Sequence, residues 1–285
     1  MKIIKSISEM KNFSHTLRKA GKKIGFVPTM GALHEGHLSL LRTIQKQCDI
    51  SVLSIFVNPT QFGPHEDFNK YPRPFDEDCQ KAKDNWCDII FAPASEEMYP
   101  QDYCTYVEVQ KVSENLCGKY RVGHFRGVAT VVLKLINIVM PHFVIFGQKD
   151  AQQCIVIKRM IEDLNVNVNM LIGETVREPD GLAMSSRNSY LTQEERNEAP
   201  NIYKGLQKAE LLYQNGERDS NKIISAVNEI YKKSETFNVE YIDVVDTKLV
   251  QPISIIKDKA LLAVAVRTKQ TNTRLIDNVI LGGSL

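Results

Sequence analysis

The sequence predicts an α/β fold, a Rossmann-like doubly wound parallel sheet followed by a smaller C-terminal α+β domain. Through residues 1–176, short continuous apolar runs alternate with segments of helical periodicity, as expected for strands buried on both faces of a parallel sheet. Polar segments containing Gly, His, Asn or Lys follow three of these runs. After residue 176 helices precede strands, which is typical of an α+β domain. We therefore expect two domains, at 1–176 and 177–285.

Apolar runs mark the strands expected in the first domain, at Ile24–Val27, Ile50–Val57, Asp88–Ala92, Phe143–Gly147 and Val166–Ile172. The segments beside them carry apolar residues at helical spacing. The expected helices are Ser8–Ala20, Gly36–Gln47, Pro74–Asn85, Phe125–Met140 and Ala151–Leu164. Because ligands of such sheets bind beyond the carboxyl ends of the strands, we expect a site in the loops that follow them.

The second domain begins with a helix start signal. Thr192 is a good N-cap residue, and acidic residues suited to a first helical turn follow it. Helical segments then extend to about Lys233, with a break near Asn215–Gly216. The expected strands are Val239–Val245, Ala260–Val266 and Arg274–Ile280.

Composition excludes several classes of function. The formal net charge is +2, and there is no basic stripe that would bind nucleic acid. No apolar stretch reaches the roughly 18 residues of a membrane span, and the N-terminus lacks a signal-peptide core. The six cysteines form no Cys-x-x-Cys pair, which is typical of reduced thiols. We therefore expect a cytoplasmic protein without membrane or nucleic-acid partners.

The segment Pro28–His37 carries the most chemical information. It lies between an expected buried strand and an expected helix, where free N–H groups at a helix start attract anions. His34 and His37 can donate to phosphate oxygens, while Gly31 and Gly36 allow close approach to the backbone. A metal site would need further ligands that the neighbouring sequence does not supply. The simpler alternative is one capping and one solvent-exposed histidine.

Two further segments follow expected strands. Asn58 and Gln61 bear amides that suit a small hydroxylated acid or an amine, although Pro59 and Gly63 would also explain a polar turn. In Gly147–Asp150, the lysine suits phosphate and the aspartate suits ribose hydroxyls. An ordinary glycine turn is an equally good interpretation of that segment.

Three other segments each allow two interpretations. Met184–Arg187 offers two hydroxyls and a guanidinium that can clamp a polyphosphate, although a surface loop is commoner for such a sequence. His124 and Arg126 either add positive potential or simply belong to a helix-entry turn. Arg73, between two prolines, is interpreted as structural or gating and is left out of the site.

Together these motifs resemble the pantothenate synthetase family, in the same order and over nearly the whole chain. The resemblance rests on Pro28–His37, Phe56–Gly63, Gly147–Asp150 with Gln153, and Met184–Arg187. The histidine pair is similar to the "HIGH" signature of the nucleotidylyltransferase superfamily. The Met184–Arg187 segment resembles its "KMSKS" counterpart, with Ser-Arg where Lys-Ser is usual.

The resemblance implies an ATP-dependent, Mg²⁺-requiring ligase. In this family pantoate attacks the α-phosphate of ATP to give pantoyl adenylate and pyrophosphate. The amine of β-alanine then displaces AMP to give pantothenate. The resemblance also implies a cytosolic homodimer. Because an acyl adenylate hydrolyses in water, we expect the second domain and the Gly181–Asn188 loop to close over the site.

The expected site residues fall into three groups, and no metal ligand is assigned. Catalytic donors to developing negative charge are His34, His37, Lys149 and Arg187. The expected ATP-binding residues are Met30, Gly31, Ala32, Leu33, His34, Glu35, Gly36, His37, Gly147, Gln148, Lys149, Asp150, Val176, Met184, Ser185, Ser186 and Arg187. The expected contacts to pantoate or β-alanine are Asn58, Gln61 and Gln153.

Two other functions remain open at this point. A nucleotidylyltransferase acting on a phosphorylated acceptor would keep the fold, but it would leave the amides of Asn58 and Gln61 without a role. A non-catalytic adenine-nucleotide sensor would bind ATP without turnover. The number of phosphate donors argues against a sensor, which needs affinity rather than charge stabilisation at a reacting centre.

Overall fold

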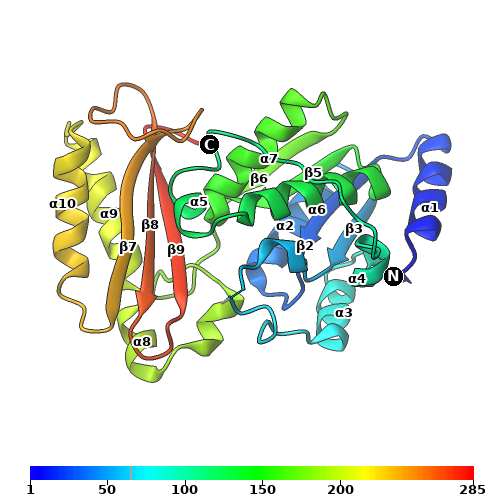
Figure 1. Ribbon diagram of the computed structural model, residues 1–285, viewed down its shortest axis with the longest axis horizontal. Helices are drawn as coiled ribbons and strands as arrows, with labels where there is room; N and C mark the ends of the chain where they lie inside the picture. The colour runs from blue at the N-terminus through cyan, green and yellow to red at the C-terminus, as the bar shows by residue number, and fades with distance from the viewer. Residues whose placement is uncertain (65) are drawn as a thin grey trace. The chain divides into compact units, whose positions relative to one another are not determined.

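The computed structural model describes residues 1–64 and 66–285, and the chain divides into two compact units (Figure 1). Unit 1 comprises Met1–Val109, Arg121–Gly147 and Val156–Gly173. Unit 2 comprises Gln110–Tyr120, Gln148–Ile155 and Glu174–Leu285. The second unit thus includes two segments that precede residue 176 in the sequence. The domain boundary expected at that residue stays a prediction.

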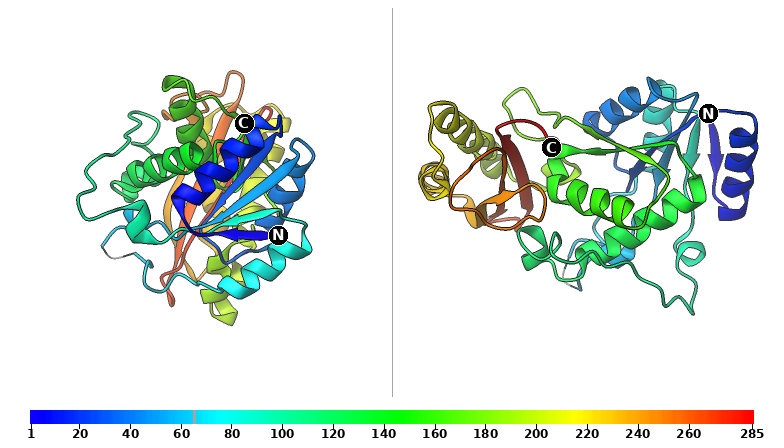
Figure 2. Two further views of the ribbon diagram at one scale, coloured as in Figure 1. Left: turned by 90° about the vertical axis from the view of Figure 1, so that its right-hand side faces the viewer. Right: turned by 90° about the horizontal axis from the view of Figure 1, so that it is seen from above.

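Unit 1 contains a parallel sheet in the order β1-β4-β3-β2-β5-β6. Its strands are β1 (Lys2–Ile4), β2 (Ile24–Thr29), β3 (Ile50–Ile55), β4 (Ile89–Phe91), β5 (Phe143–Gly147) and β6 (Asn169–Gly173). The predicted doubly wound parallel sheet is therefore confirmed. Of these strands the sequence missed β1, whose three residues are too short for a periodicity argument. Figure 2 shows β1 running beside the first helix.

Helices cover both faces of this sheet. They are α1 (Ile7–Lys19), α2 (Glu35–Gln45), α3 (Phe75–Asp84), α4 (Ser95–Met98), α6 (His124–Val139) and the later part of α7 (Ala151–Asp163). Buried Val27, Leu53 and Ile145 pack in one cluster with α2 and α3 residues. Side chains alternate along a strand, so the buried residues adjacent in sequence to these three point to the opposite face of the sheet. On that face α1 and α6 pack on β2.

The strand order creates a switch point beside β2. From β2 the chain continues to β3 and β4 on one side, whereas β5 and β6 lie on the other side. Parallel strands end at one edge, so the segments after β2, β3 and β5 leave from the same edge, as expected. One detail of the prediction is wrong: Pro28 and Thr29 belong to β2, because they continue its ladder with Ser54 and Ile55.

Unit 2 contains an antiparallel sheet of β7 (Phe237–Asp246), β8 (Ala260–Thr268) and β9 (Arg274–Leu281). The helices α8 (Gln193–Glu198), α9 (Asn201–Gln214) and α10 (Ser220–Tyr231) precede it. α9 and α10 pack against each other and against the sheet (Figure 1). The predicted α+β character is confirmed, as is the helix break near Asn215, which is the C-cap of α9.

The early segments of unit 2 are short and attach to its sheet. They contain α5 (Cys117–Tyr120) and the 3₁₀ turn η2 (Gln148–Asp150), and a further 3₁₀ turn η3 (Ser186–Tyr190) comes later. The Tyr120 hydroxyl donates to the carbonyl of Glu240 over 2.8 Å, and η2 contacts β9. Among the residues that the structure describes, no helix is long and apolar enough to cross a bilayer.

A buried carboxylate organises the start of α8. Glu195 is fully buried, and one of its oxygens accepts the backbone N–H groups of Gln270 and Thr271, each over 2.9 Å. The other oxygen accepts the backbone N–H of Thr192 and the hydroxyl of Thr271. Burial by itself would raise the pKa of Glu195, but hydrogen bonds from Thr271 and Thr192 hold that pKa at about 2.

We expect Glu195→Gln to lower the free energy of unfolding by about 1–3 kcal/mol at pH 7, because an amide places N–H donors against N–H donors. The pKa of Glu195 is lower in the folded protein than its ordinary 4.5. Its stabilisation is therefore complete above about pH 4.5 and is lost as pH falls towards 2. Urea unfolding at several pH values measures this, with the exposed neighbour Glu194→Gln as control. A difference between variant and wild type that is independent of pH would contradict the assignment.

Candidate active site

The segment after β2 forms a tight turn into α2. Gly31 and Ala32 both have positive φ, 81° and 51° respectively, and His34 is the N-cap of the helix. The Nδ1 atom of His34 accepts the backbone N–H of Gly36 over 3.1 Å, and Nδ1 of His37 accepts the backbone N–H of His34 over 3.3 Å. Both histidines therefore cap the same helix start, and their ring centroids lie 4.1 Å apart.

This capping geometry determines the tautomers of the two rings. A ring nitrogen that accepts a backbone N–H carries no proton, so in the neutral form each ring of His34 and His37 is protonated on Nε2. Each Nε2–H is then a hydrogen-bond donor at a helix N-terminus, where the backbone already favours negative charge. Both histidines thus cap the helix start, whereas the alternative from the sequence had one capping and one solvent-exposed histidine, and their contact with phosphate oxygens stays a prediction.

Two side chains of α3 hold the turn from the other side. The carboxylate of Asp78 is buried and accepts the backbone N–H groups of Ala32 and Leu33, over 2.8 and 2.7 Å. Lys81 donates to the carbonyl of Leu33 over 3.0 Å. Sequence reasoning missed Asp78, because an acidic residue in a first helical turn is ordinarily explained by the helix dipole. Burial raises the pKa of Asp78, and the two backbone hydrogen bonds oppose that rise.

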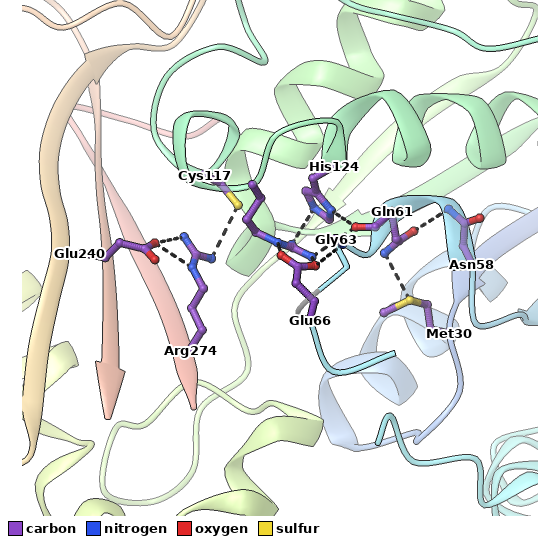
Figure 3. A network of polar contacts seen from close by, with 10 residues as sticks. Met30, Asn58, Gln61, Gly63, Glu66, Cys117, His124, Glu240 and Arg274 are labelled. Carbon is purple, nitrogen blue, oxygen red and sulfur yellow. Dashed lines mark hydrogen bonds and ion pairs between the residues drawn. The ribbon is translucent and has the colours of Figure 1, made fainter. Parts of the chain in front are cut away.

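Asn58 and Gln61, in the segment after β3, have different hydrogen-bond partners (Figure 3). Asn58 is buried, and its Nδ2 donates to Gln61 Oε1 over 3.0 Å and to the carbonyl of Gly127 over 3.2 Å. Its Oδ1 accepts the hydroxyls of Thr60 and Tyr99. Asn58 therefore orients Gln61, and a direct substrate contact of Asn58 stays a prediction.

Gln61 is better placed to bind a ligand than Asn58. Its Nε2 donates to the sulfur of Met30 over 3.2 Å (Figure 3). A thioether is a weak acceptor, so this N–H group can exchange the sulfur for a substrate oxygen at little cost. Met30 belongs to the turn that leads to His34, so the amide of Gln61 and the histidine segment are linked within unit 1.

The predicted ATP-binding residues of unit 2 fall into two groups. In the first, Asn278 of β9 donates through Nδ2 to the carbonyls of Gln148 and Lys149, over 2.9 and 2.8 Å. Next to it, fully buried Asp277 pairs with Arg177 at 2.6 Å. The backbone that carries Lys149 is therefore held by the C-terminal sheet.

The second group lies on a short hairpin. The backbone N–H of Met184 donates to the carbonyl of Val176 over 3.0 Å, so these two predicted residues are neighbours. Ser185 caps the 3₁₀ turn that contains Ser186 and Arg187, with its hydroxyl accepting the N–H of Arg187 over 3.2 Å. The structure brings Val176 and Met184–Arg187 together within unit 2. Their convergence with His34 and His37 on one nucleotide stays a prediction.

The two adjacent glutamines at the start of α7 have different surroundings. Gln152 is buried, donating to the carbonyls of Val112 and Asn115 and accepting the N–H of Cys117. Its amide is fully used by protein partners. Gln153 is only partly buried, and its contact with pantoate, which the sequence interpretation proposed, stays a prediction.

We expect Asp78→Asn to weaken ATP binding roughly 10-fold, because an amide can accept only one of the two N–H groups that shape the turn. Isothermal titration with ATP in the absence of other substrates measures the effect. Asp76→Asn, an exposed change in the same helical turn, is the matched control. Unchanged affinity in the Asp78 variant, with an intact fold, would show that the turn does not depend on this carboxylate.

Comparison with known proteins identifies the family of this chain. The family model described as pantoate–β-alanine ligase matches residues 2–280. A pantothenate synthetase of Thermotoga petrophila is 54% identical over 99% of this chain and 100% of its own length. One of Thermoanaerobacter sp. strain X514 is 50% identical over the full length of both chains.

Solved structures give the same result. A pantothenate synthetase from Thermus thermophilus superimposes with a TM-score of 0.93 at 37% identity, covering 99% of this chain and 100% of that one. A pantoate–β-alanine ligase from Francisella tularensis, complexed with β,γ-ATP and β-alanine, gives a TM-score of 0.81 at 32% identity, covering 100% and 99%. The chain therefore belongs to the pantoate–β-alanine ligase family, as its motifs predicted.

Proposed function

We propose that this protein condenses pantoate with β-alanine at the expense of ATP, through pantoyl adenylate. Family membership supports the reaction and favours it over the transferase and the sensor considered from the sequence. The observation that carries the proposal is the paired capping of α2 by His34 and His37 through Nδ1, which in the neutral rings puts the proton on Nε2 at a helix N-terminus. The amide of Gln61 belongs to the same unit, bound to Met30 of the same turn.

In the first step, an oxygen of the pantoate carboxylate forms a bond to the α-phosphorus of ATP. The bond from that phosphorus to the oxygen bridging the α- and β-phosphates breaks, and pyrophosphate leaves with its electron pair. Because the attacking group is already an anion, this step needs stabilisation of negative charge rather than a general base. We assign that stabilisation to His34 and His37 as neutral donors and to the cations of Lys149 and Arg187. The remaining ATP-binding residues expected from the sequence are proposed to hold the nucleotide.

In the second step, the amine nitrogen of β-alanine bonds to the acyl carbon, AMP leaves with the electron pair of the broken C–O bond, and the nitrogen loses a proton. Gln61 and Gln153 are proposed to hold pantoate, with Asn58 orienting Gln61. Closure of the Gly181–Asn188 loop over the adenylate stays a prediction.

Mg²⁺ is proposed to accompany ATP. Among the described residues no three His, Cys, Asp or Glu side chains gather into a potential cage. Mg²⁺ commonly keeps several waters and binds through substrate phosphates with one or two carboxylates, so this donor set is compatible with an ion carried by the triphosphate. The ion would neutralise part of the phosphate charge, and the protein's own side chains named above would stabilise the negative charge that develops during the reaction.

The homodimer and the cytoplasmic location are also proposals. The dimer rests on the family resemblance, and light scattering on the purified protein tests it. The location is supported by the free thiols, several of which are buried, because unpaired cysteines are typical of reducing compartments.

Pantoate-dependent exchange of pyrophosphate into ATP tests the proposed function. We expect wild type to catalyse exchange only when pantoate is present, and His37→Ala to lower the rate about 10²–10³-fold, the usual cost of one preorganised donor. His15→Ala, which changes an exposed histidine on α1, is the control. Exchange that ignores pantoate would overturn the substrate assignment, and an unaffected His37 variant would overturn the role of the histidine.

The glutamine pair provides an independent prediction. Gln153→Ala should raise the KM for pantoate roughly 10-fold with little change in stability, since it removes a ligand contact. Gln152→Ala should lower the free energy of unfolding by about 1–3 kcal/mol, because it leaves the buried partners of that amide unpaired. Steady-state kinetics and urea unfolding of both variants separate the two roles. The reverse assignment of effects would show that Gln152 is the ligand-binding residue.

A further inference from the structure

The short turn η1 (Pro59–Gln61), which carries Gln61, is held by a polar chain that the proposed reaction does not use (Figure 3). The chain begins at an ion pair. Arg121 donates through Nε to Glu66 Oε1 over 2.7 Å and through Nη2 to Glu66 Oε2 over 2.6 Å. The two side chains are only 14% and 22% exposed. Burial by itself would raise the pKa of Glu66, but the hydrogen bonds and charge of Arg121 hold that pKa at about 2.

Arg121 then fixes the orientation of His124, the first residue of α6. Its Nη1 lies 2.9 Å from His124 Nε2. A guanidinium has donors only, so Nε2 must accept, and the proton of the imidazole must reside on Nδ1. His124 Nδ1 lies 2.8 Å from the carbonyl oxygen of Gln61, which can only accept. Every hydrogen bond in the chain from Glu66 to Gln61 therefore has one permitted direction.

Close packing of α6 against η1 also restricts the backbone position of Gln61. A Cβ atom on Gly127 of α6 would lie 2.3 Å from the carbonyl oxygen of Thr60 and 2.7 Å from Cα of Gln61, so the helix touches the turn directly. The side-chain oxygen of Gln61 is held separately by Asn58. Backbone and side chain are thus fixed by different partners, and the Nε2 group is the part left to meet a substrate.

We propose that Glu66, Arg121 and His124 are positioning residues that fix the backbone of Gln61, and so place the side-chain amide that Asn58 orients, and thereby set the affinity for the hydroxy acid. They act through the main-chain carbonyl of Gln61 and need not touch the ligand. The proposal rests on the proposed function, because it takes Gln61 as the residue that binds pantoate. It also gives a role to His124, which the sequence interpretation left open between positive potential and a helix-entry turn.

Substitutions at His124 test the positioning role. His124→Phe keeps the ring and removes both hydrogen bonds, so the KM for pantoate should rise roughly 10-fold, the effect of about one hydrogen bond, while the KM for ATP changes less than about 2-fold. His124→Asn retains a donor at the position of Nδ1 and should restore most of the affinity. Val122→Ala, at a 91% exposed neighbour, is the control. Equal effects of His124→Phe and His124→Asn would overturn the proposal.

A double-mutant cycle separates positioning from general disruption. If His124 acts through Gln61, then His124→Phe should have no further effect on the pantoate KM in a Gln61→Ala background. Additive effects would overturn the proposal while leaving the proposed function intact. If Gln61→Ala alone leaves the pantoate KM unchanged, the assignment of Gln61 fails, and with it this proposal.

One measurement does not depend on activity. Long-range ¹H–¹⁵N correlation spectra of imidazole-labelled protein report the tautomer of each histidine, with His124→Asn identifying the signal that belongs to residue 124. We expect His124 to be protonated on Nδ1 and the neutral forms of His34 and His37 on Nε2. A proton on Nε2 of His124 would overturn the chain of hydrogen bonds even in an enzyme that uses pantoate.

Discussion

The site of unit 1 depends on one buried carboxylate. Asp78 accepts two consecutive backbone N–H groups of a turn with positive φ angles, and that turn carries β2 into α2. Without these bonds, the backbone N–H groups of Ala32 and Leu33 would lose their acceptors. Nothing would then compensate for the positive φ angle of Ala32, which residues with a side chain disfavour. The placement of His34 as N-cap follows directly from this turn. The turn that places His34 and His37 at the start of α2 is therefore held by Asp78 of α3.

The two nitrogens of each histidine ring at the start of α2 differ in what they can do. His34 and His37 satisfy backbone N–H groups through Nδ1, and this same contact leaves Nε2–H as the donor in the neutral ring. Capping and anion binding are thus not alternatives, because one nitrogen does the first and the other is suited to the second. The same logic applies in reverse at His124, where an arginine imposes the opposite tautomer.

Within each unit, amide side chains differ in burial and in the number of protein partners that they have. Asn58 and Gln152 are buried and use their amides on protein partners, whereas their neighbours Gln61 and Gln153 are only partly buried. In unit 2, Asn278 supports the backbone beside Lys149. A buried amide must find partners within the protein, and it can then hold the exposed one in a defined orientation.

The sequence alone determined the fold class and the order of nearly all strands and helices, and it indicated the segments in which we expect the site. Apolar runs and helical periodicity are local properties, and they predicted β2 to β6 and β7 to β9 closely. Tertiary structure decided which of several similar residues are buried and which partners they bind, as with Asp78, Asn58, Gln152 and His124. These roles depend on hydrogen bonds between residues far apart in the chain, 69 positions in the case of Asn58 and Gly127, and such partners leave no periodicity in the sequence.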